Sequence, residues 1–239
     1  YSYVETFFAV IRYSLEDQRF LTLSCKVTKE VVSLDLAPAE REHMIEAGPG
    51  HHLSPQQFHD VIATAAARKE QQARNKERSI DPKDSQQDQD QDSQQDSKQE
   101  RGDVVLIDVR NIYETEIGKF ECPAGIPVLD PKTRKFKEFK NFVDANKHEL
   151  RDKQVLMYCT GGVRCERASA YLRLSGVRDV SQLSGGIHSY QEAFPGGEGF
   201  FRGKNFVYDR RIAVPHKHLD EVVGHCRLCG ASYDDYKPQ

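Results

Sequence analysis

Hydrophobic residues gather in short runs in the second half of the chain. Residues 104–109 form an apolar run interrupted only by Asp108, which is typical of a central parallel strand, and 154–158 and 180–183 predict two further strands. Apolar residues at helical spacing occur between them, at 136–150 and 165–174. Strands that alternate with helices predict an α/β fold, in which a parallel sheet is flanked by helices. Ligands of such sheets bind at the carboxyl ends of the strands.

The first half of the chain has a different pattern. Residues 7–11 and 20–34 predict two strands, which are too few to form a stable unit alone. A helix is predicted to begin after Ser54, with Pro55 at its first position and Gln57 completing a capping box. Its apolar face carries Phe58, Val61, Ile62 and Ala65, and the pattern fades after Ala67.

Residues 79–101 consist almost entirely of Gln, Asp, Ser and Lys. Such a segment cannot bury enough apolar surface to offset its ordering entropy, so it predicts a disordered insert. An interaction tail is the alternative. The composition of the chain agrees, because 38% hydrophobic and 30% charged residues among 239 indicate a folded part and a solvated part.

Cysteine usage and hydropathy indicate the compartment. The six cysteines are too dispersed for the framework of a small secreted domain, so a reducing, cytoplasmic location is expected. No stretch approaches ~18 apolar residues, and no membrane partner is expected. The chain begins with Tyr1 rather than Met, which indicates a fragment or a processed form.

The junction after residue 158 carries the candidate chemistry. Cys159 follows a predicted strand, and a helix opens near Cys165. Gly161 and Gly162 allow the backbone between them to turn tightly, with N–H groups pointing inward. These amides, the positive helix end and Arg164 stabilise a thiolate, so the pKa of Cys159 should fall below ~8.5. The prediction is a nucleophilic sulfur in an anion-binding loop, and a buried inert cysteine is the alternative.

Two further residues of this loop have alternative roles. Arg164 either positions an oxyanion of the substrate or closes the loop by bonding backbone carbonyls. Cys165 either resolves an oxidised Cys159 as a disulfide or packs as a small apolar residue. The predicted anion-binding loop comprises Thr160, Gly161, Gly162, Val163 and Cys165, with Cys159 and Arg164 as catalytic residues.

The run Cys-Thr-Gly-Gly-Val-Arg at 159–164 resembles the active-site loop of rhodanese domains, whose pattern is Cys-x-x-Gly-x-Arg. The run Leu-Ile-Asp-Val-Arg at 106–110, with Glu114 and 116–120, resembles the first rhodanese motif. Leu-Ser-Gly-Gly-Ile at 183–187 resembles the closing motif. The resemblance covers roughly residues 103–194 and implies a rhodanese-like fold.

A narrower resemblance extends beyond this domain. The runs at 159–172, 204–211 and 226–229 look like the subfamily of bacterial tRNA uridine hydroxylases, which make 5-hydroxyuridine at the wobble position, and of eukaryotic rhodanese-domain-containing protein 2. Members carry a ferredoxin-like domain first, and 20–34 resembles its end. The implied division is a partial ferredoxin-like region and linking helix at 1–72, the insert at 73–101, the rhodanese domain at 102–212 and a Cys/His-containing tail at 213–239.

The resemblance implies three possible functions. The first is a sulfurtransferase that forms a persulfide on Cys159 and passes sulfur from a small sulfane-sulfur donor to a thiol, cyanide or another acceptor, with no cofactor required. The second is a tRNA uridine hydroxylase-like enzyme, and the third is a non-catalytic binding module. Phosphatases of the Cdc25 type share this fold by resemblance but need five residues between Cys and Arg, whereas this loop has four.

Other candidate residues are less specific. Asp108 and Arg110 at a strand end either support the site or form a structural ion pair, Arg110 with Glu114 or Glu116. Cys226 and Cys229 have the spacing of half a zinc site, with His216, His218 and His225 nearby; a free or redox-active pair is the alternative. Residues 103–217 carry 19 Lys and Arg against 15 Asp and Glu, a net charge of +4. A basic cluster there either contacts tRNA phosphates or is a solvated helix face; it comprises Lys132, Arg134, Lys135, Lys137 and Lys140.

Overall fold

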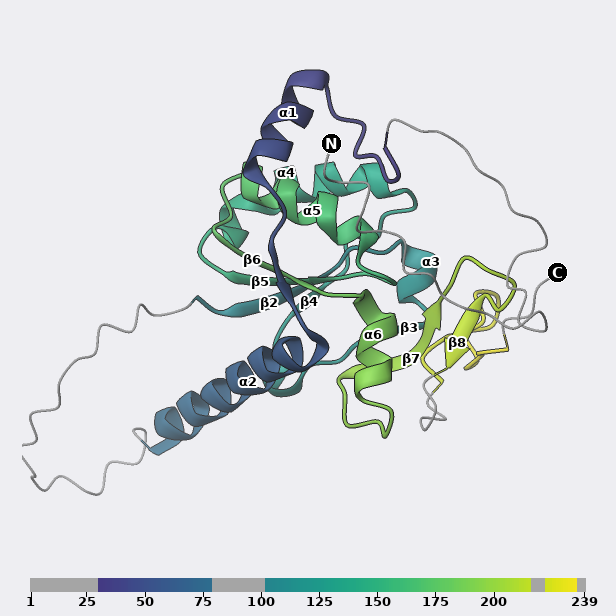
Figure 1. Cartoon of the computed structure of the whole chain (residues 1–239). Coiled ribbons are helices and arrows are strands. Elements are labelled where there is room, and N and C mark those ends of the chain that lie inside the picture. Colours follow the sequence, from purple (N-terminus) through teal and green to yellow (C-terminus); the bar gives the residue numbers. More distant parts are fainter. Residues whose placement is uncertain (1–29, 79–101, 216–221, 236–239) are drawn as a thin grey trace, which may run out of the picture.

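The computed structural model of the chain describes residues 30–78, 102–215 and 222–235 (Figure 1). The strand predicted at 7–11, most of that at 20–34 and the insert predicted at 79–101 lie outside these residues. For 30–34 the strand prediction is wrong, because these residues form no ladder and Val31 is 87% exposed.

A five-stranded parallel sheet forms the centre, in the order β1-β6-β5-β2-β4. Its strands are β1 (His51–Leu53), β2 (Val104–Asp108), β4 (Val128–Leu129), β5 (Gln154–Tyr158) and β6 (Asp179–Leu183). The three predicted strands are confirmed as β2, β5 and β6, and every residue of β2 and β5 is buried. Continuous burial on both faces explains why the sequences of β2 and β5 are almost entirely apolar.

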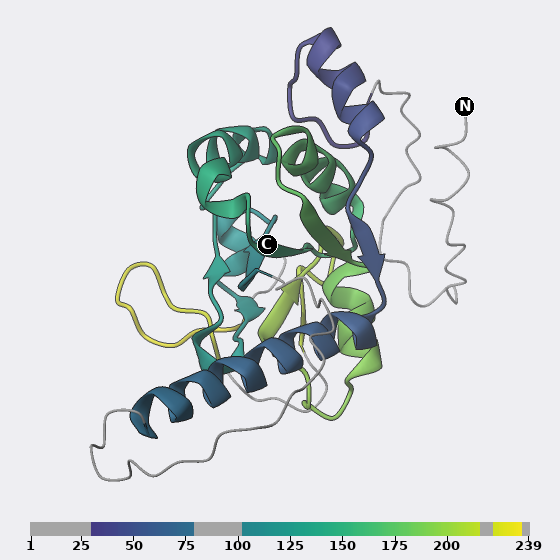
Figure 2. The ribbon, with the colours of Figure 1, turned by 90° about the vertical axis from the view of Figure 1, so that its left-hand side faces the viewer.

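Alternate residues of these strands enter two separate cores. Val105 and Ile107 face one core with helices α1 (Pro38–Ala47), α4 (Phe139–Leu150) and α5 (Val163–Leu174). Val104 and Leu106 face the other core, with α2 (Pro55–Arg78) and α6 (Gly186–Ala193). Figures 1 and 2 show the sheet between these two helical layers. The predicted α/β fold with a helix-flanked parallel sheet is confirmed.

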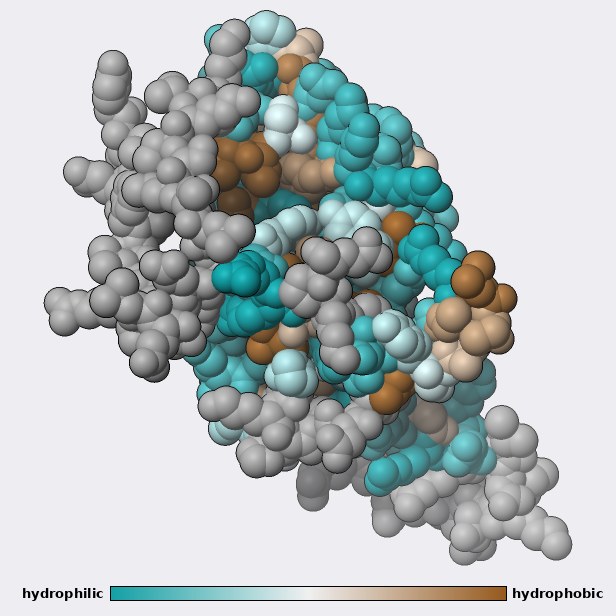
Figure 3. All heavy atoms as spheres, turned by 90° about the vertical axis from the view of Figure 1, so that its right-hand side faces the viewer, coloured by the Kyte–Doolittle hydropathy of each residue, from teal (hydrophilic) through white to brown (hydrophobic). Residues whose placement is uncertain are grey.

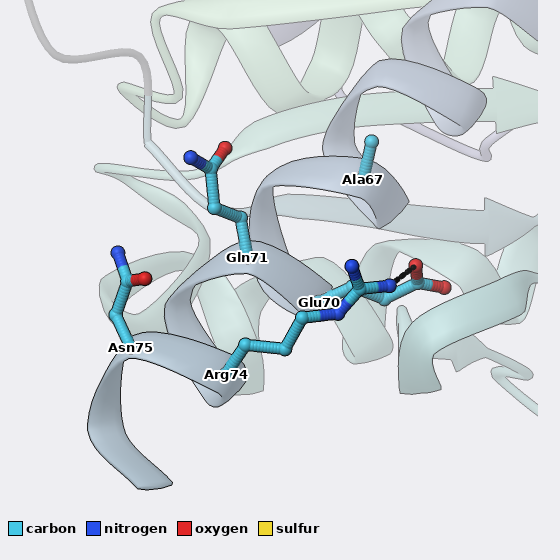
Figure 4. Close-up of a pocket in the computed structure, with 5 residues that line it drawn as sticks. All are labelled: Ala67, Glu70, Gln71, Arg74 and Asn75. Carbon is cyan, nitrogen blue, oxygen red and sulfur yellow. Dashed lines mark ion pairs between the residues drawn. The ribbon is translucent and has the colours of Figure 1, made fainter. Parts of the chain in front are cut away.

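Helix α2 begins as predicted and ends later. The Ser54 hydroxyl accepts a hydrogen bond from the Gln57 N–H at 3.2 Å, and the Gln57 side chain accepts one from the Ser54 N–H at 2.9 Å. The helix continues to Arg78, past the predicted fading at Ala67. Its outer half needs no apolar face, because Ala, Arg, Glu and Gln favour the helical backbone and Glu70 pairs with Arg74 (Figure 4).

Residues 51–78 contribute to the same cores as the domain predicted to begin at 102. Strand β1 pairs with β6 through His51–Ser181, His52–Gln182 and Leu53–Leu183. Phe58 and Ile62 of α2 are both fully buried in the core beneath the sheet. The predicted boundary therefore separates an edge strand and a helix from the fold to which they belong.

The remaining described elements form a smaller layer beside the sheet. Strands β3 (Gly118–Phe120), β7 (Phe201–Phe206) and β8 (Ala213–Pro215) pair antiparallel in the order β3-β7-β8. A short helix, α3 (Ile112–Thr115), and 3₁₀ turns at Pro123–Gly125 and Phe136–Glu138 complete the connections. None of the helices in the described ranges is long and apolar enough to cross a bilayer.

Candidate functional site

Cys159 lies at the carboxyl edge of the parallel sheet, directly after β5. The loop reaches α5 at Val163 through Gly162, which has a φ of +88°. This conformation favours glycine and turns the Gly162 N–H toward the Cys159 sulfur, to which it donates at 3.1 Å. The predicted strand–loop–helix arrangement is present, and the sulfur lies among backbone donors.

These surroundings lower the pKa of Cys159 to about 6. The largest cause is a hydrogen bond from the Cys165 thiol; burial acts in the opposite direction, and the charge of Arg164 and the amides of Cys165 and Arg164 add to the lowering. Both sulfurs are buried, with Cys159 only 1% exposed. Burial, together with the neighbouring Cys159, raises the pKa of Cys165 well above its ordinary value. Cys165 therefore remains a thiol where Cys159 is a thiolate.

A second glycine loop supports the first from the neighbouring strand. Residues Gly185 and Gly186 follow β6, and the next two amides hold the Cys159 loop: Ile187 N–H donates to the Cys159 carbonyl at 2.9 Å and His188 N–H to the Thr160 carbonyl at 3.1 Å. A Cβ on Gly186 would lie 2.4 Å from the Cys159 carbonyl oxygen. The Leu-x-Gly-Gly sequence therefore permits the two loops to approach closely.

The guanidinium of Arg164 is held by Glu114 rather than by backbone carbonyls. Its Nη1 and Nη2 atoms donate to the two carboxylate oxygens of Glu114 at 2.6 and 2.7 Å, and Nη2 also reaches the Thr160 hydroxyl at 3.1 Å. Burial would raise the pKa of Glu114, but the hydrogen bonds and charge of Arg164 outweigh it and lower this pKa. The pair fixes the loop and leaves the positive charge near Cys159.

Tyr208 completes this cluster from the segment after β7. Its hydroxyl donates to Glu114 Oε1 at 2.8 Å, and its ring centre lies 5.9 Å from the guanidinium carbon of Arg164. Neither Glu114 nor Tyr208 was predicted as a site residue. Glu114 lies in the first rhodanese motif and Tyr208 in the run at 204–211. Glu114 also has a local sequence signal, because Asn111 and Glu114 form a capping box at α3.

Asp108 and Arg110 form a buried structural pair. Arg110 Nη2 donates to Asp108 Oδ2 at 2.7 Å and to the Gly118 carbonyl at 2.6 Å, and Nη1 donates to the Glu114 carbonyl at 3.2 Å. The prediction that Arg110 pairs with the carboxylate of Glu114 or Glu116 is therefore wrong. The Glu114 carboxylate bonds Arg164 instead, and Arg110 joins β2 to α3 and β3 beneath the site.

The predicted basic cluster is divided. Lys137 pairs with Asp35 at 3.3 Å, and Lys140 pairs with Asp144 at 2.9 Å, so these two charges are partly neutralised. Lys132, Arg134 and Lys135 are exposed and form no ion pair with the described residues. Arg134 lines a cleft beside α3.

The Cys226–Cys229 pair lies in a tight turn. Gly230 N–H donates to the Cys226 carbonyl and Cys226 N–H to the Ala231 carbonyl, both at 2.8 Å. Amides of Cys229 and Leu228 lower the pKa of Cys226. Two thiols are only part of a tetrahedral zinc site, and no group of three His, Cys, Asp or Glu residues converges within the described ranges. His216 and His218 lie outside these ranges, and zinc stays a prediction.

Two family models match the chain. The model described as the rhodanese-like domain matches residues 91–193, which contain the Cys159 loop and the Gly185–Gly186 loop. The model described as the rhodanase C-terminal region matches residues 202–238, which contain Tyr208 and the Cys226–Cys229 turn.

Relatives of known name align over most of the chain. A protein of Arabidopsis thaliana named rhodanese-like domain-containing protein 6 is 39% identical over 94% of this chain and 33% of its own length. A tRNA uridine(34) hydroxylase of Acinetobacter baumannii is 31% identical over 90% of this chain and 53% of its own length. The chain thus spans about a third to a half of these relatives.

A solved structure was also matched. The Saccharomyces cerevisiae homologue of single-domain rhodanese and the Cdc25 phosphatase catalytic domain has a TM-score of 0.39 and 15% identity, covering 64% of this chain and 87% of its own.

Proposed function

The chain contains a rhodanese-like domain followed by the rhodanese C-terminal region, and on this basis we propose that it is a sulfurtransferase that forms a persulfide on Cys159. The observation that carries the proposal is the environment of the Cys159 sulfur, which accepts the Gly162 N–H at 3.1 Å and has a pKa lowered to about 6. At neutral pH such a thiol is roughly nine-tenths ionised, and the thiolate is the nucleophile.

The reaction consists of two successive displacements at sulfur. The Cys159 thiolate attacks the outer sulfur of a donor such as thiosulfate; a new S–S bond forms, and sulfite leaves with the electron pair of the broken bond. An acceptor thiolate or cyanide then attacks the terminal persulfide sulfur and releases the Cys159 thiolate. Both steps keep negative charge on sulfur at the loop, where the backbone N–H groups stabilise it.

The loop residues have distinct parts in this proposal. The amides around Gly162 stabilise the anionic sulfur, while Arg164 supplies positive charge and directs both terminal nitrogens at Glu114 and Thr160. Arg164 therefore acts as a positioning residue for the loop. Direct binding of a donor oxyanion by Arg164, one of the two alternatives for this residue, stays a prediction.

The test is the intact mass of the protein after incubation with thiosulfate, beside Cys159→Ser. The expected result is a gain of one sulfur atom in the wild-type chain and none in the variant, followed by loss of that sulfur on adding cyanide. A wild-type chain that gains no sulfur, while Cys159 still reacts rapidly with iodoacetamide, would contradict the proposal.

A second candidate function is modification of a tRNA uridine. The relative with that name in Acinetobacter baumannii aligns over 90% of this chain. The same Cys159 would serve it. A reactive Cys159 that accepts no sulfur from thiosulfate would place this function ahead of the first.

A further inference from the structure

A cleft of about 630 Å³ lies beside the Cys159 site. Its wall is built from α3, from the loop before α4 and from the C-terminal segment, through Ile112, Tyr113, Glu116, Arg134 and Arg227. The volume is within the range of pockets that bind small organic ligands and exceeds what a sulfane-sulfur anion needs. Of these residues, only Arg134 has been considered above for ligand binding, as a member of the predicted basic cluster.

Two arginines from distant parts of the sequence meet in this cleft. Arg134 is exposed and forms no ion pair with the described residues. Arg227 donates to Glu116 Oε2 at 2.6 Å through one nitrogen, and two-thirds of its side chain remains exposed. Glu116 thus occupies one guanidinium nitrogen of Arg227, while the other guanidinium donors stay available. Planar donors of this kind bind phosphate groups through two parallel hydrogen bonds.

Tyr113 lines the cleft and belongs to an aromatic cluster with Phe206 and Tyr208. Tyr113 is 37% exposed and Tyr208 59% exposed. Phe206 packs edge-on against both rings, at centroid distances of 5.3 and 5.1 Å. Exposed rings next to arginines are the combination that single-stranded nucleic acids use, because bases stack on the rings and phosphates pair with the cations.

Hydrogen bonds connect the cleft directly to the loop of Cys159. The Tyr113 and Tyr208 hydroxyls lie 3.1 Å apart, Tyr208 bonds Glu114 at 2.8 Å, and Glu114 bonds Arg164. Only Tyr208 therefore lies between a ligand on Tyr113 and the Glu114–Arg164 pair that holds the Cys159 loop. Figure 3 shows this side of the molecule, where the hydrophobic residues visible between the grey atoms occur as separate groups among hydrophilic ones.

We propose that this cleft binds a nucleotide of a single-stranded RNA loop, with its base on Tyr113 and its phosphate on Arg134 and Arg227. The proposal deepens the tRNA-modifying function and rests on it. The proposal also assigns a role to residues 222–235. Arg227 completes the wall of the cleft, and the Cys226–Cys229 turn positions Arg227.

The test is fluorescence anisotropy with a fluorescein-labelled RNA stem-loop that carries uridines in its loop. Arg134→Gln with Arg227→Gln should weaken binding about tenfold at low salt and should reduce the slope of log affinity against log salt by about 0.7 for each lost phosphate contact. Tyr113→Ala should weaken binding, and Tyr113→Phe, which keeps the ring, should not. The matched control is Lys137→Gln, an exposed cation outside the cleft.

Glu116→Gln separates a binding role of Arg227 from a purely structural one. Loss of the carboxylate frees Arg227 and removes a negative charge, so RNA should bind more tightly, whereas Arg227→Gln weakens binding. If both variants weakened binding equally, with equal falls in melting temperature, Arg227 would only anchor the segment and the proposal would be overturned.

Two further outcomes overturn the proposal: a wild-type chain that does not bind the stem-loop, or a chain that binds heparin equally well and is unaffected by Tyr113→Ala. The sulfur-transfer proposal is judged separately, because gain of sulfur from thiosulfate needs no RNA. Sulfur gain without RNA binding would remove only the cleft proposal, and RNA binding through the cleft without sulfur gain would remove only the sulfurtransferase.

Discussion

Cys159 begins the loop after β5, and Cys165 lies in the first turn of α5 that follows it. Their surroundings shift the pKa values of the two thiols in opposite directions. The pKa of Cys159 is lowered to about 6, while burial and the adjacent Cys159 sulfur raise that of Cys165 well above its ordinary value. The two effects are linked, because Cys165 can donate a hydrogen bond to the Cys159 thiolate only while it remains protonated. Cys165 is thus more than a small packing residue.

Replacing Cys165 tests this link. Cys165→Ala removes the donor at nearly the same volume and should raise the pKa of Cys159 by about one to two units, the value of a lost hydrogen bond to a charged group. Thiolate forms as pH rises through the pKa, so the alkylation rate of Cys159 should reach half its maximum near pH 6 in the wild type and at higher pH in the variant. Iodoacetamide rates across pH, with peptide mapping, measure both.

Cys165→Ser is the matched control, because a hydroxyl keeps the donor. Its alkylation profile should stay close to that of the wild type. An identical midpoint in Cys165→Ala would mean that the backbone amides and Arg164 alone set the pKa.

At this scale the sequence could predict the nucleophile but not its full surroundings. Cys159 and Arg164 are close along the chain, so a local motif is sufficient to find them. Glu114 and Tyr208 meet Arg164 only through the tertiary fold, because each comes from a different element. The alternative in which Arg164 bonds backbone carbonyls is wrong for this reason, since a buried carboxylate is a stronger partner.

At the scale of elements, the shape of the site depends on two loops that touch through backbone atoms. Gly186 has a φ of +64°, and a Cβ there would meet the Cys159 carbonyl oxygen, the Gly161 nitrogen and the Thr160 carbonyl carbon, all at 2.7 Å or less. These atoms belong to backbone and cannot rotate away. Gly161 differs, because a Cβ there would meet nothing within 4 Å.

Gly186→Ala should therefore lower the melting temperature by several degrees and slow alkylation of Cys159, because the β6 loop must move away and the Ile187 and His188 hydrogen bonds to the Cys159 loop weaken. Gly161→Ala, in the same site, should melt close to the wild type. Thermal unfolding by circular dichroism gives the comparison. Equal melting temperatures for the two variants would show that the close approach is not rigid.

Element prediction succeeded where burial is continuous and failed where it is not. Strands β2 and β5 are apolar except for Asp108 and Gln154, because both faces are covered. Strand β7 buries only alternate residues, and two of those are Gly203 and Asn205, so no apolar alternation marks it. Strands β3 and β4 have three and two residues, which is too short for any period to be recognised.

At the scale of the whole molecule, residues 51–78 are a structural part of the domain. Phe58 contacts the ring of Phe120 at a centroid distance of 5.7 Å and that of Tyr190 at 6.4 Å. Strand β1 covers an edge of the sheet at β6. The sequence located α2 through its cap, but a three-residue edge strand with two exposed histidines gave no apolar signal.

A chain that begins at residue 102 should accordingly fail to fold cooperatively. It would expose the Phe120 and Tyr190 rings and an unpaired edge of β6, which favours aggregation. A chain that begins at residue 30 should melt in one sharp transition. Within the full chain, Phe58→Ala should cost about 3–5 kcal/mol of unfolding free energy, measured by urea titration. A cooperative transition in the shorter chain would show that the domain begins where the sequence placed it.

The pairing of β1 with β6 and the burial of α2 against α6 have one more consequence. The covalent connection between residues 78 and 102 is not what joins the two portions, because a ladder of backbone hydrogen bonds and an aromatic core already do so. A protease cut between them should leave a nicked but intact molecule. The two pieces, expressed separately, should reassemble, so the domain is suited to fragment complementation with the reactivity of Cys159 as its readout.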